Sequence, residues 1–262
     1  MEMKNEFLLS VKVFKNYDVW VELAFSQIRT RYARTVLGPI WELLGLVFLL
    51  IPLAILWSRL WDRPVADFFV YLFSGYSLFR YISTTIGDAS QNFLTGYGAL
   101  IKNVNINPLV CTLALCFRNF IFFCHILIFI FFLGFFFELQ INFLLLLLYL
   151  VCLFITLLNV STLVAFVCVR FRDLSNLIGL FMSLLFFFTP IIWDIDQLPE
   201  KHKVLFIEPN LLYHYIEFFR STILNGNVNN LSFNVVLIFT LTSTFFTLFV
   251  LKKYRKILVT WI

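Results

Sequence analysis

The chain has 262 residues, of which 61% are hydrophobic and 13% charged, and its mean hydropathy is +0.91. Soluble domains carry roughly 25% charged residues, and no soluble fold of this size can bury so much apolar surface. The composition therefore indicates an all-α membrane protein, because helices satisfy their own backbone hydrogen bonds in hydrocarbon. The net charge of +5 does not indicate a nucleic-acid partner, since Lys and Arg cluster beside the ends of apolar runs.

Residues 16–34 precede the first apolar run and have the pattern of an amphipathic helix. Its apolar residues recur at helical spacing, namely Trp20, Leu23, Ala24 and Ile28. Such a helix is typical of the membrane interface, although a solvated helix that only carries topogenic charge has the same pattern. Gly38 permits a sharp bend after it, and Pro39 suits the first turn of a spanning helix. We therefore divide the chain into an interfacial segment, 1–36, and a transmembrane domain, 37–262.

Six apolar runs are candidates for transmembrane helices, since a helix needs about 20 mostly apolar residues to cross the hydrocarbon. They cover residues 41–59, 68–87, 109–137, 143–169, 177–193 and 233–251. Arg80 and Arg118 fall inside the second and third runs, where a charge is costly and can be functional. Thirteen of the 20 Lys and Arg residues lie before the first run, in the second and fourth connections, and after the last run. The positive-inside rule then predicts that both termini are cytoplasmic.

Two connections contain more than a simple link between spans. Residues 88–108 mix polar and aromatic residues, and they predict either a short cytoplasmic helix that docks on another protein or a plain loop. The outer segment, 194–230, contains two helix-like pieces that begin at Pro199 and Pro209, and neither is long enough to cross the membrane. We expect these pieces to lie at the outer interface or to dip into it as short gate helices.

The sequence contains no pattern expected of an enzyme or a metal site. Its three His residues are far apart, its five Cys residues form no C-x-x-C pair, and no G-x-x-x-x-G-K-[ST] phosphate loop occurs. We therefore predict no catalytic, cofactor-binding or metal-binding residue in this chain. ATP and Mg would have to be bound by another subunit.

Three motifs, in this order, resemble the permease of ABC-2 type polysaccharide exporters, which move O-antigen, capsule or teichoic acid chains. They are RYARTVLGPIW at 31–41, FRDL at 171–174 and TPIIW at 189–193. The resemblance implies a bacterial inner-membrane permease that pairs with a second copy of itself and with two copies of a separate ATPase. Its substrate would be a lipid-linked polysaccharide. An ABC-2 permease for a drug or a lipid is the main alternative, and a membrane acyltransferase is less favoured.

The resemblance also suggests roles for individual positions. The ATPase-coupling segment, near 90–100, would include Asn92, Phe93, Tyr97 and Leu100, with Arg172 and Asp173 as a second candidate contact. Apart from the resemblance, either Asp173 or Ser175 can cap the helix of the fifth run. The interfacial helix and its bend would include Trp20, Arg29, Arg31, Arg34, Leu37 and Gly38. The channel and the outer gate would be lined by Trp41, Phe48, Phe187, Trp193, Tyr213 and Tyr215.

Overall fold

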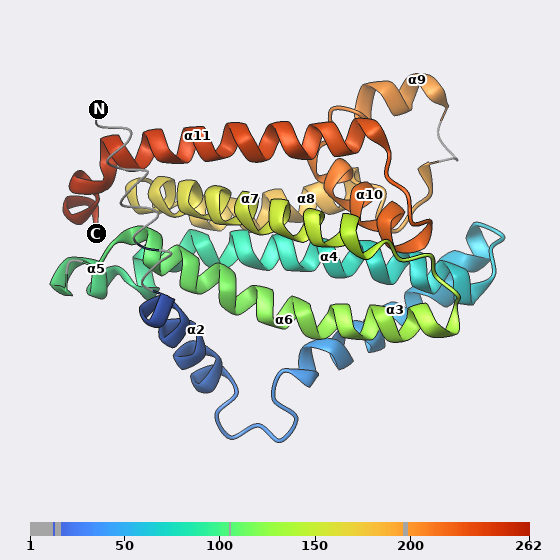
Figure 1. Cartoon of the computed structure of the whole chain (residues 1–262), viewed down its shortest axis with the longest axis horizontal. Helices are drawn as coiled ribbons and strands as arrows, with labels where there is room; N and C mark the ends of the chain where they lie inside the picture. The colour runs from blue at the N-terminus through green and yellow to red at the C-terminus, as the bar shows by residue number, and fades with distance from the viewer. Residues whose placement is uncertain (1–12, 14–16, 105, 196–198) are drawn as a thin grey trace.

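The computed structural model describes residues 13, 17–104, 106–195 and 199–262, and it builds these residues into helices without any strand. Parts of the predicted segments 1–36 and 194–230, namely residues 1–12, 14–16 and 196–198, lie outside the described residues. Six helices run alongside one another in the described part (Figure 1): α3 (Ile40–Leu60), α4 (Val65–Gln91), α6 (Pro108–Phe136), α7 (Phe143–Arg170), α8 (Leu174–Phe188) and α11 (Asn230–Trp261).

Shorter elements lie at the two ends of this bundle (Figure 1). At one end are α2 (Tyr17–Arg31), η1 (Asn92–Gly96), α5 (Gly98–Val104) and the last turns of α11. We call it the α5 end. At the opposite end are α9 (Glu200–His202), η3 (Lys203–Ile207) and α10 (Leu211–Leu224). We call that the α10 end. The short helix predicted within 88–108 and the two pieces predicted after Pro199 and Pro209 are therefore helical, and none of them is long enough to span a bilayer.

Four helices in the described part are long and apolar enough to cross a membrane, namely α3, α6, α7 and residues Asn230–Arg255 of α11. Helix α4 is long enough but carries Asp67, Arg80 and Asp88. Helix α8 has 15 residues, which is about 22 Å at 1.5 Å per residue and shorter than the hydrocarbon core. Four of the six predicted spans therefore meet both criteria, and the crossing by α4 and α8 stays a prediction.

The fifth predicted run, 177–193, extends beyond the helix that it contains. Helix α8 ends at Phe188, and Thr189 has the extended backbone angles φ −100° and ψ 137°. Pro190 explains the end, because proline disfavours helical angles at the residue before it and has no N–H to continue the hydrogen-bond ladder. The helix therefore ends inside a continuous apolar run, and Pro190 marks where it ends.

Helix α4 forms the centre of the bundle and packs against α3, α6, α7, α8 and α10. Because it faces protein on most sides, small polar residues are accepted along it. Ser74, Ser77 and Thr85 are buried, and each donates its hydroxyl to a carbonyl of the same helix at 2.9, 3.1 and 2.7 Å. This central position explains why α4 is less apolar than the lipid-facing helices around it.

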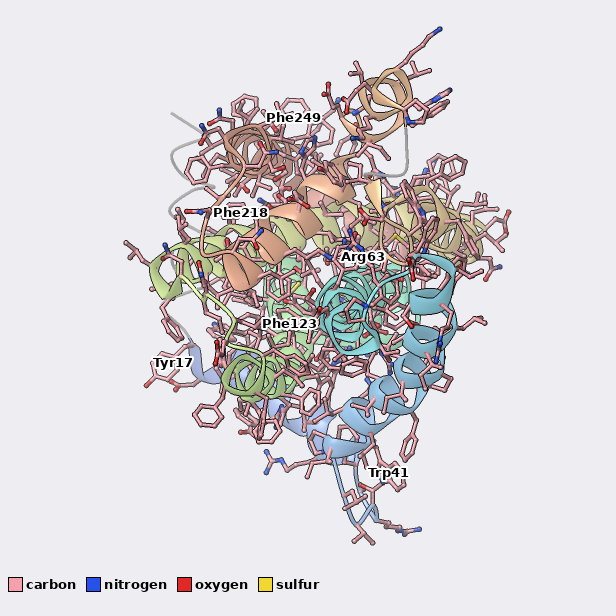
Figure 2. All side chains as sticks on the ribbon, turned by 90° about the vertical axis from the view of Figure 1, so that its right-hand side faces the viewer. Tyr17, Trp41, Arg63, Phe123, Phe218 and Phe249 are labelled. Carbon is pink, nitrogen blue, oxygen red and sulfur yellow. The ribbon has the colours of Figure 1, made fainter. Side chains whose placement is uncertain are left out.

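The buried side chains form two clusters. The larger one fills the bundle from its middle to the α10 end and includes Phe123, Tyr149 and Phe218. The smaller one lies at the α5 end and includes Phe93 and Phe166. In Figure 2, which views the molecule from the α10 end, Phe123 and Phe218 lie among the helices while Trp41 lies at the periphery.

A seam of polar side chains joins α7 to α11 and α10. The Thr156 hydroxyl lies 2.8 Å from the Tyr215 hydroxyl and 2.9 Å from that of Thr240. One turn further, the Asn159 amide donates to the Thr244 hydroxyl at 2.8 Å. Hydrogen bonds of this kind hold membrane helices together where apolar contacts alone do not favour protein over lipid.

We predict that Asn159→Ala lowers the free energy of unfolding in lipid bicelles by about 1 kcal/mol, because it leaves the facing hydroxyls on α11 without their partner. Asn176→Ala on the exposed face of α8 is the matched control and should change it by less than about 0.5 kcal/mol. Equal effects of the two substitutions would show that the seam does not stabilise the bundle.

Candidate functional site

The connection between α2 and α3, residues 32–39, projects from the side of the bundle (Figure 1). Two of its residues have left-handed backbone angles, Arg34 with φ +68° and Gly38 with φ +52°. The bend predicted at Gly38 is therefore present, and glycine accepts it without the strain that a side chain would bring. Helix α3 begins directly after Pro39.

The carboxylate of Glu42, in the first turn of α3, links the two helices on either side of this connection. It accepts hydrogen bonds from Arg31 at the end of α2 and from Arg80 in α4, each at 2.5 Å. The Tyr32 hydroxyl donates a third, longer bond of 3.3 Å. Burial raises the pKa of Tyr32 above its ordinary value, and the charge of Glu42 adds to that effect, so the phenol stays protonated and able to donate. One acidic side chain therefore joins α2, α3 and α4.

The position of Glu42 also accounts for Arg80. Helix α3 has 21 residues, or about 31 Å, so it just spans the hydrocarbon and its first turn lies at the membrane boundary. Glu42 is in that first turn, and Arg80 pairs with it. Arg80 therefore lies at the boundary rather than in the middle of a span, and α4 continues beyond it for 11 residues.

A second ionic contact, centred on Arg118 of α6, lies close by. Arg118 donates to the Gln27 side chain of α2 at 2.6 Å and forms an ion pair with Asp88 near the end of α4. The Asn119 amide donates to the same carboxylate at 3.1 Å. Helices α2, α4 and α6 are thus joined through polar side chains, and Asp88 lies only four residues before η1.

The apolar face predicted for the interfacial helix packs against α6. Ala24 is fully buried, and the Trp20 ring meets the Phe117 ring of α6 edge-on at 5.1 Å. Tyr17, Val19 and Phe25 are exposed on the same helix, and the Phe25 ring also lies 6.5 Å from the Phe117 ring. The predicted face therefore holds α2 against α6.

In the coupling segment, η1 and α5, most of the predicted contact residues face inward. Asn92, Phe93 and Tyr97 are buried, with Phe93 1% exposed and its ring 5.7 Å from that of Phe166. Gly98 allows the tight turn between the two helices, since a Cβ there would lie 2.4 Å from the Phe93 carbonyl oxygen. Direct contact of these side chains with a partner, as predicted, is therefore not possible in this conformation. Leu100 is half-buried, and the exposed residues of η1 and α5 are Thr95, Gly96, Ala99, Lys102, Asn103 and Val104.

Arg172 and Asp173 are exposed in the short connection between α7 and α8, at the α5 end. The prediction that Asp173 caps α8 is wrong, because its backbone is already helical, with φ −63° and ψ −26°, and its side chain makes no capping bond. The Ser175 hydroxyl instead donates to the Arg172 carbonyl at 2.8 Å.

The residues predicted to line a channel or a gate fall into two groups. Trp41, Phe48 and Phe187 are exposed on α3 and α8. Trp193 and Tyr213 are half-buried, and Tyr215 is buried in the polar seam. Tyr215 therefore faces the bundle interior, where its hydroxyl is engaged by Thr156.

Within the described residues, no three His, Cys, Asp or Glu side chains lie close enough together to hold a metal ion. Two histidines have structural contacts. His125 lies 2.7 Å from the Ile121 carbonyl oxygen, and His214 lies 2.7 Å from that of Glu208 and 3.0 Å from the Ser232 hydroxyl.

The family model of the ABC-2 type transporter matches residues 19–224. The chain belongs to this family. The match runs from α2 to the end of α10 and so includes the ionic contacts, the coupling segment and the segment after α8. Members of the ABC-2 family are the membrane components of transporters and act with an ABC ATPase, so this chain is a multi-pass permease. A search of curated proteins gave no match.

We predict that Arg118→Met destabilises the permease by about 2 kcal/mol, since it leaves the half-buried Asp88 without its cation. Arg29→Met is the matched control. Arg29 pairs with Glu22 on α2, and their side chains are 68% and 71% exposed. Because an exposed ion pair contributes little, loss of the Arg29 charge should cost less than about 0.5 kcal/mol. Thermal unfolding in nanodiscs measures both, and a similar loss for the two variants would contradict the role given to Arg118.

Proposed function

We propose that this ABC-2 permease exports a lipid-linked polysaccharide from the cytoplasm across the bacterial inner membrane. Two copies of the chain would work with two copies of the ATPase, which would bind the ATP and Mg. The observation that carries the proposal is the role of the motif at 31–41, the most specific of those that resemble polysaccharide exporters. It supplies both Arg31 and Tyr32 to Glu42 and the left-handed turn at Gly38.

The orientation follows from charge. The α5 end carries Lys102, Arg170, Arg172 and the basic residues of the last turns of α11. The positive-inside rule favours the cytoplasm for this end, and hence for both termini. Helices α4 and α8 would complete six crossings, with the irregular residues after Phe188 finishing the passage of α8.

The coupling segment would receive the ATPase through its exposed side chains. Thr95, Ala99 and Lys102 lie on its outer surface, while the buried Phe93 and Tyr97 attach the segment to α7 and the rest of the bundle. A force applied to η1 and α5 would then be transmitted directly to α4, which continues into η1.

A path for the polymer would form between two copies of the chain. A polar glycan is very costly to place in hydrocarbon, so it requires a path lined by protein. Helices α3 and α8 expose Trp41, Phe48 and Phe187. Aromatic faces of this kind can hold successive sugars without a fixed register, and a second copy of the same faces would enclose the path.

One observation favours a second candidate, an ABC-2 exporter of a drug or a lipid. A cavity of about 590 Å³ lies between α4, α7, α8, α10 and α11 and is lined almost entirely by apolar side chains, among them Leu157, Met182 and Phe239. Its size is in the range of sites for small apolar molecules. A glycan chain would find almost no hydrogen-bonding group there.

We predict that Ala99→Asp abolishes co-purification of the ATPase, because it puts a negative charge on the exposed surface of the coupling segment. Gln140→Asp is the control, since Gln140 is exposed between α6 and α7 at the α10 end and cannot touch a cytoplasmic partner. Both variants should express and unfold like the wild type. Retention of the ATPase by Ala99→Asp would place the docking surface elsewhere.

The substrate is tested by reconstituting the permease and its ATPase in proteoliposomes. We expect lipid-linked polysaccharide to reach the far side only with ATP and an ATPase able to hydrolyse it, and to stimulate ATP hydrolysis. If apolar drugs or phospholipids stimulate hydrolysis and the glycan does not, the second candidate is correct. Glycan export that persists with a hydrolysis-deficient ATPase would contradict the proposed mechanism.

A further inference from the structure

Residues 189–195 follow the early end of α8 and continue inside the bundle without regular structure. Thr189, Pro190 and Ile191 are all buried. Carbonyl groups of an irregular, buried segment need partners, because neither water nor a helical ladder supplies them. Side chains must therefore donate hydrogen bonds to these carbonyls.

Arg220 of α10 supplies two of these bonds. It is 3% exposed, and its two terminal nitrogens donate to the Pro190 carbonyl at 2.7 Å and to the Ile191 carbonyl at 3.0 Å. Its guanidinium carbon lies 3.7 Å from the centre of the Tyr71 ring on α4, a cation–π contact. A planar guanidinium can make the two bonds and the stacking at once, whereas a lysine ammonium cannot.

Helix α4 leaves room for this side chain at one position. A Cβ at Gly75 would lie 2.1 Å from a terminal nitrogen of Arg220, so even alanine would displace the guanidinium. Gly75 on α4 and Arg220 on α10 are thus a matched pair, 145 residues apart in sequence.

Other contacts hold the two sides of the same segment. The Asn210 amide, at the start of α10, donates to the Thr189 hydroxyl at 3.0 Å. At the far side, buried Asp194 pairs with Arg63, which lies near the centre of the end-on view (Figure 2). The segment is therefore fastened to α10 at two points and to the α3–α4 connection at a third.

We propose that Arg220 is a positioning residue that locks residues 189–195 to α10, so that the end of α8 and α10 move as one body when the α10 end of the permease opens. The attachment of residues 189–195 to α10 is supported by the bonds from Arg220 to the Pro190 and Ile191 carbonyls. Its part in opening rests on the proposed function, in which this end is the outer gate.

The lock is tested by hydrogen–deuterium exchange of the full-length permease in nanodiscs. In Arg220→Met, the backbone amides of 189–195 should exchange at least about tenfold faster, since two bonds to a charged donor are lost. Gly75→Ala should do the same while keeping Arg220. Arg59→Met, which removes an exposed cation at the same end, should leave these amides unchanged.

Unchanged exchange of 189–195 in both Arg220→Met and Gly75→Ala would overturn the lock. Faster exchange throughout α7 as well as in 189–195, in both variants, would also overturn it, because the effect would then be general. The part in opening is tested separately in proteoliposomes that export with the wild-type chain. We expect Gly75→Ala to hydrolyse ATP but export at least about tenfold more slowly, and unchanged export with faster exchange would overturn that part alone.

Discussion

A charged group or an unpaired carbonyl within the membrane domain must find its partner inside the protein, and this constraint shapes the structure around the arginines of the bundle. Arg80 meets Glu42, Arg118 meets Asp88, and Arg220 meets two carbonyls of an irregular segment. Each of these contacts joins elements that are far apart in the sequence. The side chains that are most costly to bury are therefore the ones that hold the helices in register.

The ionic contacts near the α5 end connect the coupling segment to several helices. Helix α4 runs through the centre of the bundle and continues into η1 and α5. Asp88 and Arg80, on α4, connect it to α6, and through Glu42 to α2 and α3. Under the proposed function, a displacement of the coupling segment by the ATPase would move α2, α3 and α4 together as one joined unit relative to the rest of the permease, and so couple two distant sites.

Composition and local pattern predicted the helices well, since apolar length, Gly38 and the prolines act within a few residues of themselves. Contacts between residues far apart in the sequence could not be predicted from local patterns. Glu42 and Arg80 are 38 positions apart, and nothing local distinguishes Glu42 from an ordinary interfacial acid. Phe93 and Tyr97 suggested a docking surface because an aromatic side chain in a polar connection has the same sequence pattern whether it contacts a partner or fills a small core. Pro190 could have predicted the end of α8, but the apolar residues on both sides concealed it.

Glu42 holds α2 to α4 through its bonds to Arg31 and Arg80. The most direct measurement is the distance between spin labels at Ser26→Cys on α2 and Gln91→Cys at the end of α4, both exposed positions, in the reconstituted complex with and without ATP. We expect one narrow distribution that ATP does not change, and a broad one after Glu42→Gln, which keeps the shape of the side chain and removes its charge. A distribution that Glu42→Gln leaves unchanged would contradict it.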